Sequence, residues 1–378
     1  MTINFSGTRP VSGSSYDFES LFEYLEAALG PINGPPSIEQ FNGGQSNPTF
    51  KINLGPRSFV LRCRPMGEEG AKSAHAVGRE FRVLSALRDS NVPVPEPRLQ
   101  CEDTSVFGSE FYLMDYVDGR IFWDPTLPSV EAHERGRYYE EISRVIAELH
   151  QIDYQSIGLS DFGKPQGFLE RQLRRWAERY RACESEPNPD MERLLEWLPA
   201  NIPKEQSTCL IHGDYKLDNL IFHPTEPRII AVLDWELSTL GDPLVDLAYA
   251  CLGWHIDHTE RRGLRGLDLT ALGIPLEPVF VSKYLALTGR PRITDWTFYL
   301  AFNMFRFACI LEGIRARAMR GTAVNKHAID VAARSRKISK AGWNIVENGR
   351  AANGPVANDQ GPDDRGANGR GANDQAAV

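Results

Sequence analysis

The stretch LIHGDYKLDNLIFHP, residues 210–224, constrains the fold of this chain more than any other feature. A His, a Gly, an Asp and an Asn fall within eight residues, between two apolar runs that have the length of short β-strands. A further apolar run, IIAVLD, follows a turn-forming segment and ends at Asp234. The pattern predicts a β-hairpin whose second strand brings Asp234 back beside Asn219.

The polar residues of this hairpin suit phosphoryl transfer. That reaction needs a carboxylate to orient the acceptor hydroxyl, oxygen ligands for Mg²⁺, and cations around the phosphates. Asp214 and Asn219 are five residues apart, which is the spacing of base and metal-binding Asn in the kinase loop H-R-D-L-x-x-x-N. We therefore predict Asp214 as the catalytic carboxylate, with His212 orienting its loop, and Asn219 and Asp234 as metal ligands.

A structural loop rich in Asp and Asn is the alternative interpretation of the same stretch. An isolated HGD tripeptide would favour that alternative. The complete pattern adds an Asn at the right spacing, an apolar strand, a turn and the sequence VLDWE. This combination is far more specific, and it favours the phosphoryl-transfer site.

The rest of the chain predicts a two-lobed α+β fold with a cleft between the lobes. A helix is expected over 16–30, short strands over 38–43, 49–54 and 58–64, a helix over 74–90 and a buried strand over 111–119. From about residue 130 the pattern is mainly helical, and from about 350 it changes to Ala, Gly, Asn, Asp and Gln. The predicted division is an N-terminal arm and helix (1–35, with 1–14 as a loose arm), an N-lobe (36–118), a C-lobe (119–348) and a disordered tail (349–378).

The overall charge and the cysteines indicate the class of protein and its location. The net charge of −8 and the pI of about 5.6 give no reason to expect nucleic acid or an anionic membrane as a partner. No apolar run of membrane-spanning length and no signal peptide are expected. The six cysteines form no CxxC pair, which is typical of reduced thiols, so we expect a cytoplasmic protein.

HGDYKLDNLIF together with VLDWELSTLGDPLVDLA resembles the aminoglycoside phosphotransferase and choline kinase-like family, a branch of the protein-kinase-like fold. The resemblance implies a small antiparallel-β N-lobe with one main helix and a larger, mainly helical C-lobe. It gives Asp214 the role of catalytic base and assigns metal binding to Asn219 and Asp234. In the same pattern Asp246 supports the catalytic loop, although a helix cap or a surface position explains that residue equally well.

The family resemblance continues into FNGGQSNPTFKI, which stands where this family has its phosphate-binding loop. Gly43 and Gly44 permit close approach of backbone to phosphates, and Ser46 and Asn47 carry hydrogen-bond donors. The stretch lacks the G-x-G-x-x-G pattern of protein kinases, and taken alone it also fits a plain hairpin turn.

Three further segments complete the implied nucleotide site. Arg62 in FVLRCRP stands where the family has the lysine that pairs with the phosphates, with Arg64 as an alternative, and Glu80 matches the helix glutamate that holds this cation. In LMDYVDG the resemblance places the backbone of Asp115, Tyr116 and Val117 against the adenine. ATP and Mg²⁺ are therefore the expected cofactors.

A narrower resemblance covers GGQSNPT, 162–176 and 305–321. These segments are similar to the kinase-like domain found N-terminal to acyl-CoA dehydrogenase domains in some longer proteins. After residue 345 only the tail remains, so acyl-CoA dehydrogenase activity is not expected.

The acceptor is predicted from the charges of two helical segments. Seven arginines against few acids favour an anionic small molecule, such as a hydroxyacyl-CoA or a hydroxy acid; they are Arg171, Arg174, Arg175, Arg306, Arg315, Arg317 and Arg320. A solvated, salt-bridged helix face is the alternative for each of them. An aminoglycoside or amino-alcohol kinase and a nucleotide-binding pseudokinase that serves as a partner module remain open, whereas the lack of an A-P-E-type segment disfavours a protein kinase. The oligomeric state is not predicted.

Overall fold

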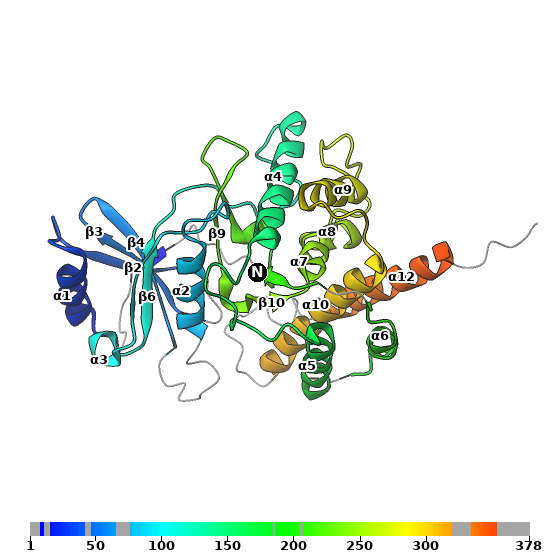
Figure 1. Ribbon diagram of the computed structural model, residues 1–378, viewed down its shortest axis with the longest axis horizontal. Helices are drawn as coiled ribbons and strands as arrows, with labels where there is room; N and C mark the ends of the chain where they lie inside the picture. Colours follow the sequence, from blue (N-terminus) through cyan, green and yellow to red (C-terminus); the bar gives the residue numbers. More distant parts are fainter. Residues whose placement is uncertain are drawn as a thin grey trace, which may run out of the picture.

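The computed structural model shows a sheet-based N-lobe and a larger helical C-lobe side by side (Figure 1). The structure describes residues 8–10, 16–41, 47–65, 76–183, 186–204, 207–319 and 334–353. The predicted phosphate loop at Gly43, Gly44 and Ser46 lies outside these residues. So does the predicted tail beyond residue 353.

The N-lobe contains a six-stranded antiparallel sheet in the order β1-β2-β3-β4-β6-β5. The strands are β1 (Thr8–Pro10), β2 (Ser37–Phe41), β3 (Thr49–Leu54), β4 (Arg57–Cys63), β5 (Pro97–Cys101) and β6 (Phe111–Asp115). The predicted meander is confirmed, with β2, β3 and β4 as consecutive neighbours. Residues 8–10 were expected in a loose arm, but they pair with the edge strand β2, whose outer backbone groups they satisfy.

Side chains alternate between the two faces of this sheet, as the period of a β-strand requires. On β4, Phe59 and Leu61 belong to a core with α1 (Phe18–Leu29) and α3 (Thr104–Phe107), whereas Val60 belongs to the core shared with α2 (Ala76–Leu87). Arg62 follows Val60 by two residues and therefore projects from the same face, towards the C-lobe. The two predicted N-lobe helices, 16–30 and 74–90, are confirmed as α1 and α2.

The link between the lobes leaves the sheet earlier than predicted. The strand expected over 111–119 ends at Asp115, because the chain then runs to Arg120, which exchanges two backbone hydrogen bonds of 2.8 Å with Phe222. Gly119 is needed at this crossing, since a Cβ there would lie 2.4 Å from the carbonyl oxygen of Phe222. The link is thus fastened to the strand that follows the HGD loop.

The C-lobe consists of helices around two small hairpin-like sheets. Its α-helices are α4 (Ala132–Gln151), α5 (Phe168–Cys183), α6 (Pro189–Ala200), α7 (Pro243–Ala250), α8 (Leu252–His255), α9 (Glu277–Thr288), α10 (Trp296–Met319) and α12 (Ser335–Asn353). The strands and 3₁₀ turns are β7 (Cys209–Ile211), η1 (Leu217–Asn219), β8 (Leu220–Phe222), β9 (Ile229–Val232), η2 (Trp235–Leu237) and β10 (Thr239–Gly241). β7 pairs with β10, and β8 pairs with β9.

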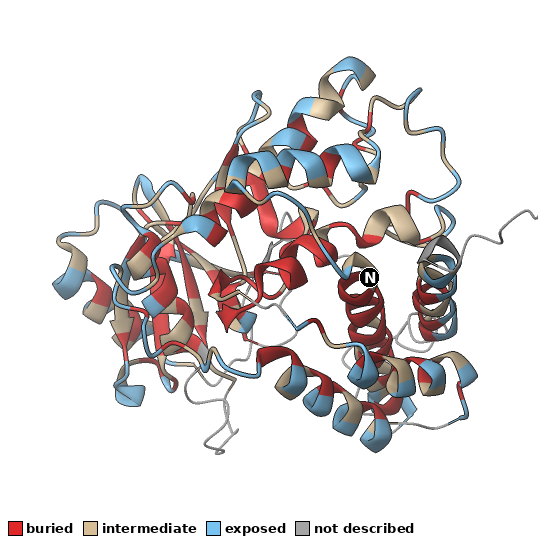
Figure 2. Ribbon diagram, turned by 45° about the vertical axis from the view of Figure 1, so that its right-hand side comes forward, coloured by how far each residue is buried: buried red, intermediate tan, exposed pale blue. Residues whose placement is uncertain are grey.

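Helix α10 forms the centre of the C-lobe, with α5, α7 and α12 packed against it. Figure 2 shows most of its middle part coloured as buried, while the outer helices are exposed on the sides that face solvent. By length and composition α10 could cross a membrane, which corrects the expectation that no such run exists. However, 72% of its apolar window is buried inside the protein, which accounts for its composition.

The C-terminal boundary also differs from the prediction. Helix α12 continues through Asn353, past the expected start of the tail at residue 349. Ala351 and Ala352 have high helix propensity, so the change in composition near residue 350 did not end the helix.

Candidate active site

The HGD loop leaves β7 in the C-lobe and is held by one buried carboxylate. Asp246 on α7 is fully buried, and its two oxygens accept the backbone N–H groups of His212 at 2.5 Å and Gly213 at 2.8 Å. Burial alone raises the pKa of Asp246, but His150 and these donors outweigh burial and keep the pKa below its ordinary value. Asp246 is therefore an ionised clamp on the loop, which agrees with the supporting position that the family pattern implies.

His212 orients the loop through both ring nitrogens. Its Nε2 lies 2.8 Å from the carbonyl oxygen of Leu233, and its Nδ1 accepts the N–H of Asp214 at 3.1 Å. The ring is fully buried. Both nitrogens are occupied by the backbone, so His212 positions Asp214 and is not placed to exchange a proton with a substrate.

Gly213 allows the tight turn between these two residues. Its φ is +82°, a left-handed conformation, and a Cβ there would lie 2.5 Å from the carbonyl oxygen of Leu237. Any larger residue would be strained and would also collide with backbone. The loop can therefore lie against η2 only because residue 213 is a glycine.

The carboxylate of Asp214 is surrounded by donors. Its Oδ2 lies 2.5 Å from Nζ of Lys216 and accepts Nδ2 of Asn219 at 3.1 Å. Burial alone raises the pKa of Asp214, but Lys216, Arg306 and a hydrogen bond from Tyr249 lower it below its ordinary value. Asp214 is consequently an ionised acceptor at neutral pH, which is the state that a base for a hydroxyl proton requires.

The predicted hairpin brings Asn219 and Asp234 together. Leu220 pairs with Val232 across β8 and β9, and the N–H of Leu233 donates to the carbonyl oxygen of Asn219 at 2.8 Å. Asp234 follows with φ 67° and ψ 58°, a left-handed conformation that is rare for residues other than glycine. Such strained backbone concentrates at functional sites, where it fixes the direction of a side chain.

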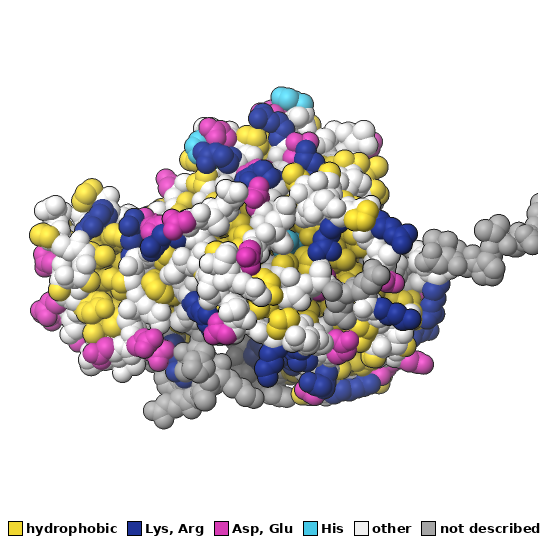
Figure 3. All heavy atoms as spheres, viewed as in Figure 1, with side chains coloured by type: hydrophobic (Ala, Val, Ile, Leu, Met, Phe, Trp, Pro, Cys, Tyr) yellow, Lys and Arg dark blue, Asp and Glu magenta, His cyan; other side chains and the backbone are white. Residues whose placement is uncertain are grey.

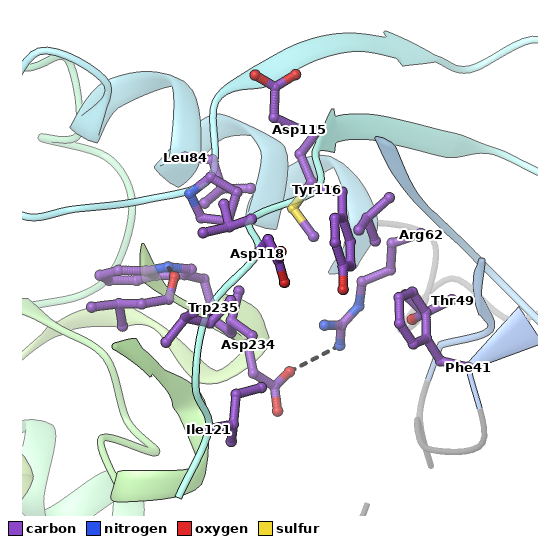
Figure 4. A pocket seen from close by; sticks show the side chains of 18 of the residues that line it. Phe41, Thr49, Arg62, Leu84, Asp115, Tyr116, Asp118, Ile121, Asp234 and Trp235 are labelled. Carbon is purple, nitrogen blue, oxygen red and sulfur yellow. Dashed lines mark hydrogen bonds and ion pairs between the residues drawn. The ribbon is translucent and has the colours of Figure 1, made fainter. Parts of the chain in front are cut away.

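Arg62 reaches across the cleft from β4 to this hairpin. Its Nη2 lies 2.9 Å from Oδ1 of Asp234 and 3.0 Å from Oε2 of Glu236, and Figure 4 shows the guanidinium directed at Asp234. On the N-lobe side, Nε lies 3.2 Å from Oε2 of Glu80 without the direction of a hydrogen bond, so this contact is an ion pair. Arg62 lines a cavity between the lobes, whereas Arg64 does not. Arg62 is therefore the better candidate of the two for the phosphate-pairing cation.

Glu80 on α2 is buried beneath Arg62. Its Oε2 accepts the Tyr112 hydroxyl at 2.7 Å, and its Oε1 lies 3.5 Å from Nδ2 of Asn47. Burial raises the pKa of Glu80 to about 7, although Arg62 acts in the opposite direction. Asn47 was predicted to donate to phosphates; in the structure its amide lies beside Glu80.

A cavity of about 400 Å³ separates the lobes at this point. Its lining includes Met114, Tyr116 and Val117 from the link, opposite Ile221 and Leu233 from the hairpin. The mixture of apolar walls with a few charged groups is typical of a small-molecule site.

The three predicted adenine-facing residues differ in what they offer to this cavity. The Asp115 carboxylate points away from the cavity in Figure 4 and pairs with Arg98 at 2.5 Å. The N–H groups of Asp115 and Tyr116 donate to the carbonyl oxygens of Glu96 and Ser58. Val117 is the candidate whose backbone makes no such bond within the described part of the chain.

Two charged residues of the site were missed by the sequence predictions. Lys216 pairs with Asp214, and Glu236 pairs with Arg62. Each follows a predicted site residue by two positions, in DYK and DWE, and this proximity was the only signal in the sequence. Arg306 on α10 was predicted from its charge alone. It donates to the carbonyl oxygen of Gly213 and so contacts the HGD loop.

Comparison with known proteins agrees with this geometry. A family model described as the phosphotransferase enzyme family matches residues 37–279. Mouse acyl-CoA dehydrogenase family member 10 is 42% identical over 341 residues, which make up 89% of this chain and 32% of that protein. The chain spans roughly a third to two-fifths of the length of the curated relatives it matches, at 32%, 41% and 40%.

Solved structures show the same fold. A protein from Ralstonia eutropha, provisionally described as an aminoglycoside phosphotransferase, is 46% identical with a TM-score of 0.80, and the match covers 88% of this chain and 99% of that one. A thermostable mutant of the aminoglycoside phosphotransferase APH(4)-Ia, in complex with ADP and hygromycin B, has a TM-score of 0.56 at 16% identity, and the match covers 86% of this chain and 98% of that one. The chain therefore belongs to the phosphotransferase enzyme family and has its two-lobed protein-kinase-like fold.

Proposed function

We propose that this chain is an ATP- and Mg²⁺-dependent kinase that phosphorylates a hydroxyl of an anionic small molecule, such as a hydroxyacyl-CoA or a hydroxy acid. The observation that carries the proposal is the convergence of Asp214, Asn219 and Asp234 at one end of a hairpin that faces Arg62. The six cysteines are unpaired, which supports a reducing, cytoplasmic location.

The lobe-separating cavity is the proposed nucleotide site. A flat aromatic base fits between the apolar residues of the link and those of the hairpin, with Val117 free to exchange hydrogen bonds with its edge. Arg62 also lines the cavity and would pair with the phosphates of the nucleotide. An aminoglycoside phosphotransferase with this fold was solved in complex with ADP, which supports nucleotide use by this fold.

The charges around Arg62 fit a divalent cation. One guanidinium faces three carboxylates, those of Glu80, Asp234 and Glu236. Asn219 and Asp234 offer amide and carboxylate oxygens from adjacent backbone positions, and Mg²⁺ is commonly held by one or two such ligands together with nucleotide phosphates. We assign Asn219 and Asp234 as its ligands; the ion would neutralise charge on the transferred phosphoryl group.

The protein's part in the transfer is to bind, orient and take a proton. Asp214 accepts a hydrogen bond from the acceptor hydroxyl, whose oxygen forms a bond to the γ-phosphorus while the bond from that phosphorus to the β-bridging oxygen breaks. The hydroxyl proton passes to Asp214, and the nucleoside diphosphate leaves with the electron pair of the broken bond. Asp246 and His212 hold Asp214 in place, and the ammonium of Lys216 stabilises negative charge beside it.

Three arginines support an anionic acceptor, and together they form the arginine cluster: Arg175, Arg179 and Arg306. They line a cleft of about 80 Å³ that also contacts Gly213 of the catalytic loop. Within the described part of the chain no Asp or Glu lines this cleft. Figure 3 shows Lys and Arg side chains gathered at the lower edge of the molecule, over α5.

The positive charge of the arginine cluster is not balanced by carboxylates in its cleft, among the residues that the structure describes. Arg306 is 6% exposed, and its guanidinium stacks over Tyr249 at 5.0 Å and Trp176 at 5.6 Å. Burial lowers the pKa of Arg179, and the like charges of Arg175 and Arg306 lower it further. A carboxylate or phosphate in this cleft would relieve the repulsion, whereas a polycationic aminoglycoside would increase it.

Most of the other predicted acceptor arginines are engaged elsewhere. Arg171 donates to the backbone carbonyl groups of Lys164 and Gln166, and Arg315 pairs with Glu186 at 2.9 Å. Arg174 lines a different groove, between α5 and α6. Arg317 has a partner as well, and Arg320 lies outside the described residues.

The test is transfer of labelled γ-phosphate from Mg·ATP to a panel of acceptors. The panel contains 3- and 4-hydroxyacyl-CoAs, the free hydroxy acids, choline, aminoglycosides and a generic protein. We expect label on the hydroxylated acids or thioesters, and a decrease in kcat of roughly 10²- to 10⁴-fold in Asp214→Asn with nucleotide binding retained. Turnover retained by that variant would contradict the role of Asp214. Label on an aminoglycoside would contradict the anionic acceptor.

A further inference from the structure

We propose, on the basis of the kinase function above, that a second cavity beside Asp214 binds a short aliphatic arm of the acceptor. The cavity is enclosed by α4, α7, α8, α9 and α10 together with the segment 256–264. Lys216 and Tyr249 line this cavity and both contact the Asp214 carboxylate, whereas Gly213, the residue before Asp214, lines the arginine cleft, so both cavities border the loop that carries Asp214. An acceptor would then carry its hydroxyl between an anionic end and an apolar end.

The walls of this cavity are largely aromatic. Tyr139, Trp254 and Phe280 contact one another, with ring centroids 5.5 Å apart for Tyr139 and Trp254 and 5.3 Å apart for Trp254 and Phe280. Phe307 and Leu264 also line the space. Rings packed on each other have little freedom to move, so these walls define a fixed shape for an occupant.

The polar atoms of two of the ring walls, Tyr139 and Trp254, are used elsewhere. The Tyr139 hydroxyl donates to the carbonyl oxygen of Pro125 at 2.6 Å, and Nε1 of Trp254 donates to that of Pro275 at 2.9 Å. These two rings therefore present carbon to the cavity. A polyhydroxylated sugar would lose its hydrogen bonds to water here without replacement, whereas an alkyl segment would gain from burial.

The charged residues that line the cavity disfavour a cationic occupant. Lys216 is paired with Asp214, and Arg262 is paired with Asp218. These two cations line the cavity together with one acid, Asp218. An aromatic pocket can bind a quaternary ammonium, but such a group would here approach a lysine and an arginine. An uncharged arm meets no such repulsion.

The size of the cavity sets the length of the arm. Its volume is about 90 Å³, smaller than the roughly 150 Å³ apolar cavity that accepts benzene in another protein. This leaves room for a few carbons. We therefore expect an optimum arm length, after which further methylenes no longer help.

The experiment measures kcat/KM for hydroxy acids and their CoA thioesters that differ only in the number of carbons beyond the hydroxyl. For the wild-type protein we expect kcat/KM to increase about threefold to fourfold with each of the first few methylenes and then to level off or decrease. Choline is included as the cationic competitor for the aromatic walls.

Two variants change the cavity in opposite directions. Ala250 and Phe307 both line it, so Ala250→Leu should shift the optimum to shorter arms and Phe307→Ala to longer ones. Ala177→Leu adds the same volume in the groove between α5 and α6 and should leave the optimum unchanged. If Ala250→Leu folds poorly, the Phe307→Ala shift alone decides the matter.

The outcomes separate this inference from the function on which it rests. No transfer to any hydroxylated acid or thioester would overturn both. Transfer that is indifferent to arm length, or an optimum that stays fixed in both Ala250→Leu and Phe307→Ala, would overturn the arm pocket and leave the kinase proposal standing. Choline as the preferred acceptor would overturn the arm pocket and the anionic acceptor together.

Discussion

Arg62, with a side chain 11% exposed, and the buried Arg306 both contact the HGD loop or its hairpin, yet their surroundings have opposite charge. Arg62 faces three carboxylates. Arg306 stands with two further arginines, and no carboxylate lines their cleft among the residues described. The first region has more negative charge than its own cation can balance, and the second has the reverse.

This difference indicates what each region lacks. Nucleotide phosphates would add negative charge beside Arg62, so binding there should require a divalent cation as well. The arginine cluster needs only an anionic ligand, and no metal. In a kinase that joins a nucleotide to an anionic acceptor, the two regions would therefore be completed by different partners, with Asp214 between them.

The largest expected effect comes from removing the cation of the first region. Arg62→Met leaves Glu80 buried without its partner, which costs on the order of 3–5 kcal/mol of unfolding free energy. Urea denaturation at pH 8 measures this loss, and titration with a nucleotide should show that binding is abolished. The loss should be smaller at pH 5, where a buried carboxyl of raised pKa takes up a proton.

Two controls test the cause of that loss. Adding Glu80→Gln to Arg62→Met should restore part of the stability but not nucleotide binding, because the stranded charge is gone while the phosphate partner is still missing. Arg64→Met replaces another arginine two positions further along the chain and should lower the free energy of unfolding much less than Arg62→Met. A denaturation midpoint of Arg62→Met equal to that of the wild type would show that Glu80 is not stranded.

A smaller effect is expected from the second region. Arg175→Gln should raise the KM for an anionic acceptor by roughly three- to tenfold, since one charge-assisted contact is lost at an exposed position. The stability should change by less than about 0.5 kcal/mol, as for most surface positions. Arg174→Gln is the matched control, because Arg174 is the preceding residue on α5 but lines the groove between α5 and α6 instead of the arginine cleft. Equal KM values for the two variants would remove the arginine cluster from the acceptor site.

These neighbouring arginines also show where prediction from sequence reached its limit. Spacing was sufficient for Asn219 and Asp234, because a hairpin of given length fixes which residues meet. It was sufficient for the N-lobe meander as well. Which face of α5 meets the catalytic loop depends on how α5 packs against α10, and such long-range packing leaves no local signal.

The same limit explains the missed partners of the site. Glu236 and Lys216 resembled ordinary charged residues in a polar stretch, and only the fold brought Glu236 to Arg62 across 174 residues of sequence. The early end of β6 had a comparable cause. The chain that continues from β6 pairs through Arg120 with Phe222 of β8 instead of the N-lobe sheet, and a single-strand pattern cannot distinguish these partners.

The smallest effect is a difference in pH dependence. Burial raises the pKa of Glu80 from its ordinary value of 4.5 to about 7, so the folded protein holds this proton more tightly than the unfolded chain. The contribution of Glu80 to stability is therefore full below pH 4.5 and is lost as the pH rises to about 7, by at most about 1.4 kcal/mol per pH unit. Glu80→Gln should remove this part of the slope in urea denaturation series.

Comparing variants of the two regions isolates the contribution of Glu80 to the pH dependence of the unfolding free energy. Burial also raises the pKa of Asp242 to about 6, which adds a slope of the same sign, but this group is present in both proteins and cancels in the difference. Arg175→Gln should have the wild-type slope, because the arginine cluster contains no carboxyl group that titrates in this range. If Glu80→Gln and the wild type have parallel profiles, Glu80 is already ionised at pH 5. Arg62 would then stabilise the ionised carboxylates around it better than a count of one cation against three carboxylates suggests. The need for a divalent cation at Asn219 and Asp234 would be correspondingly weaker.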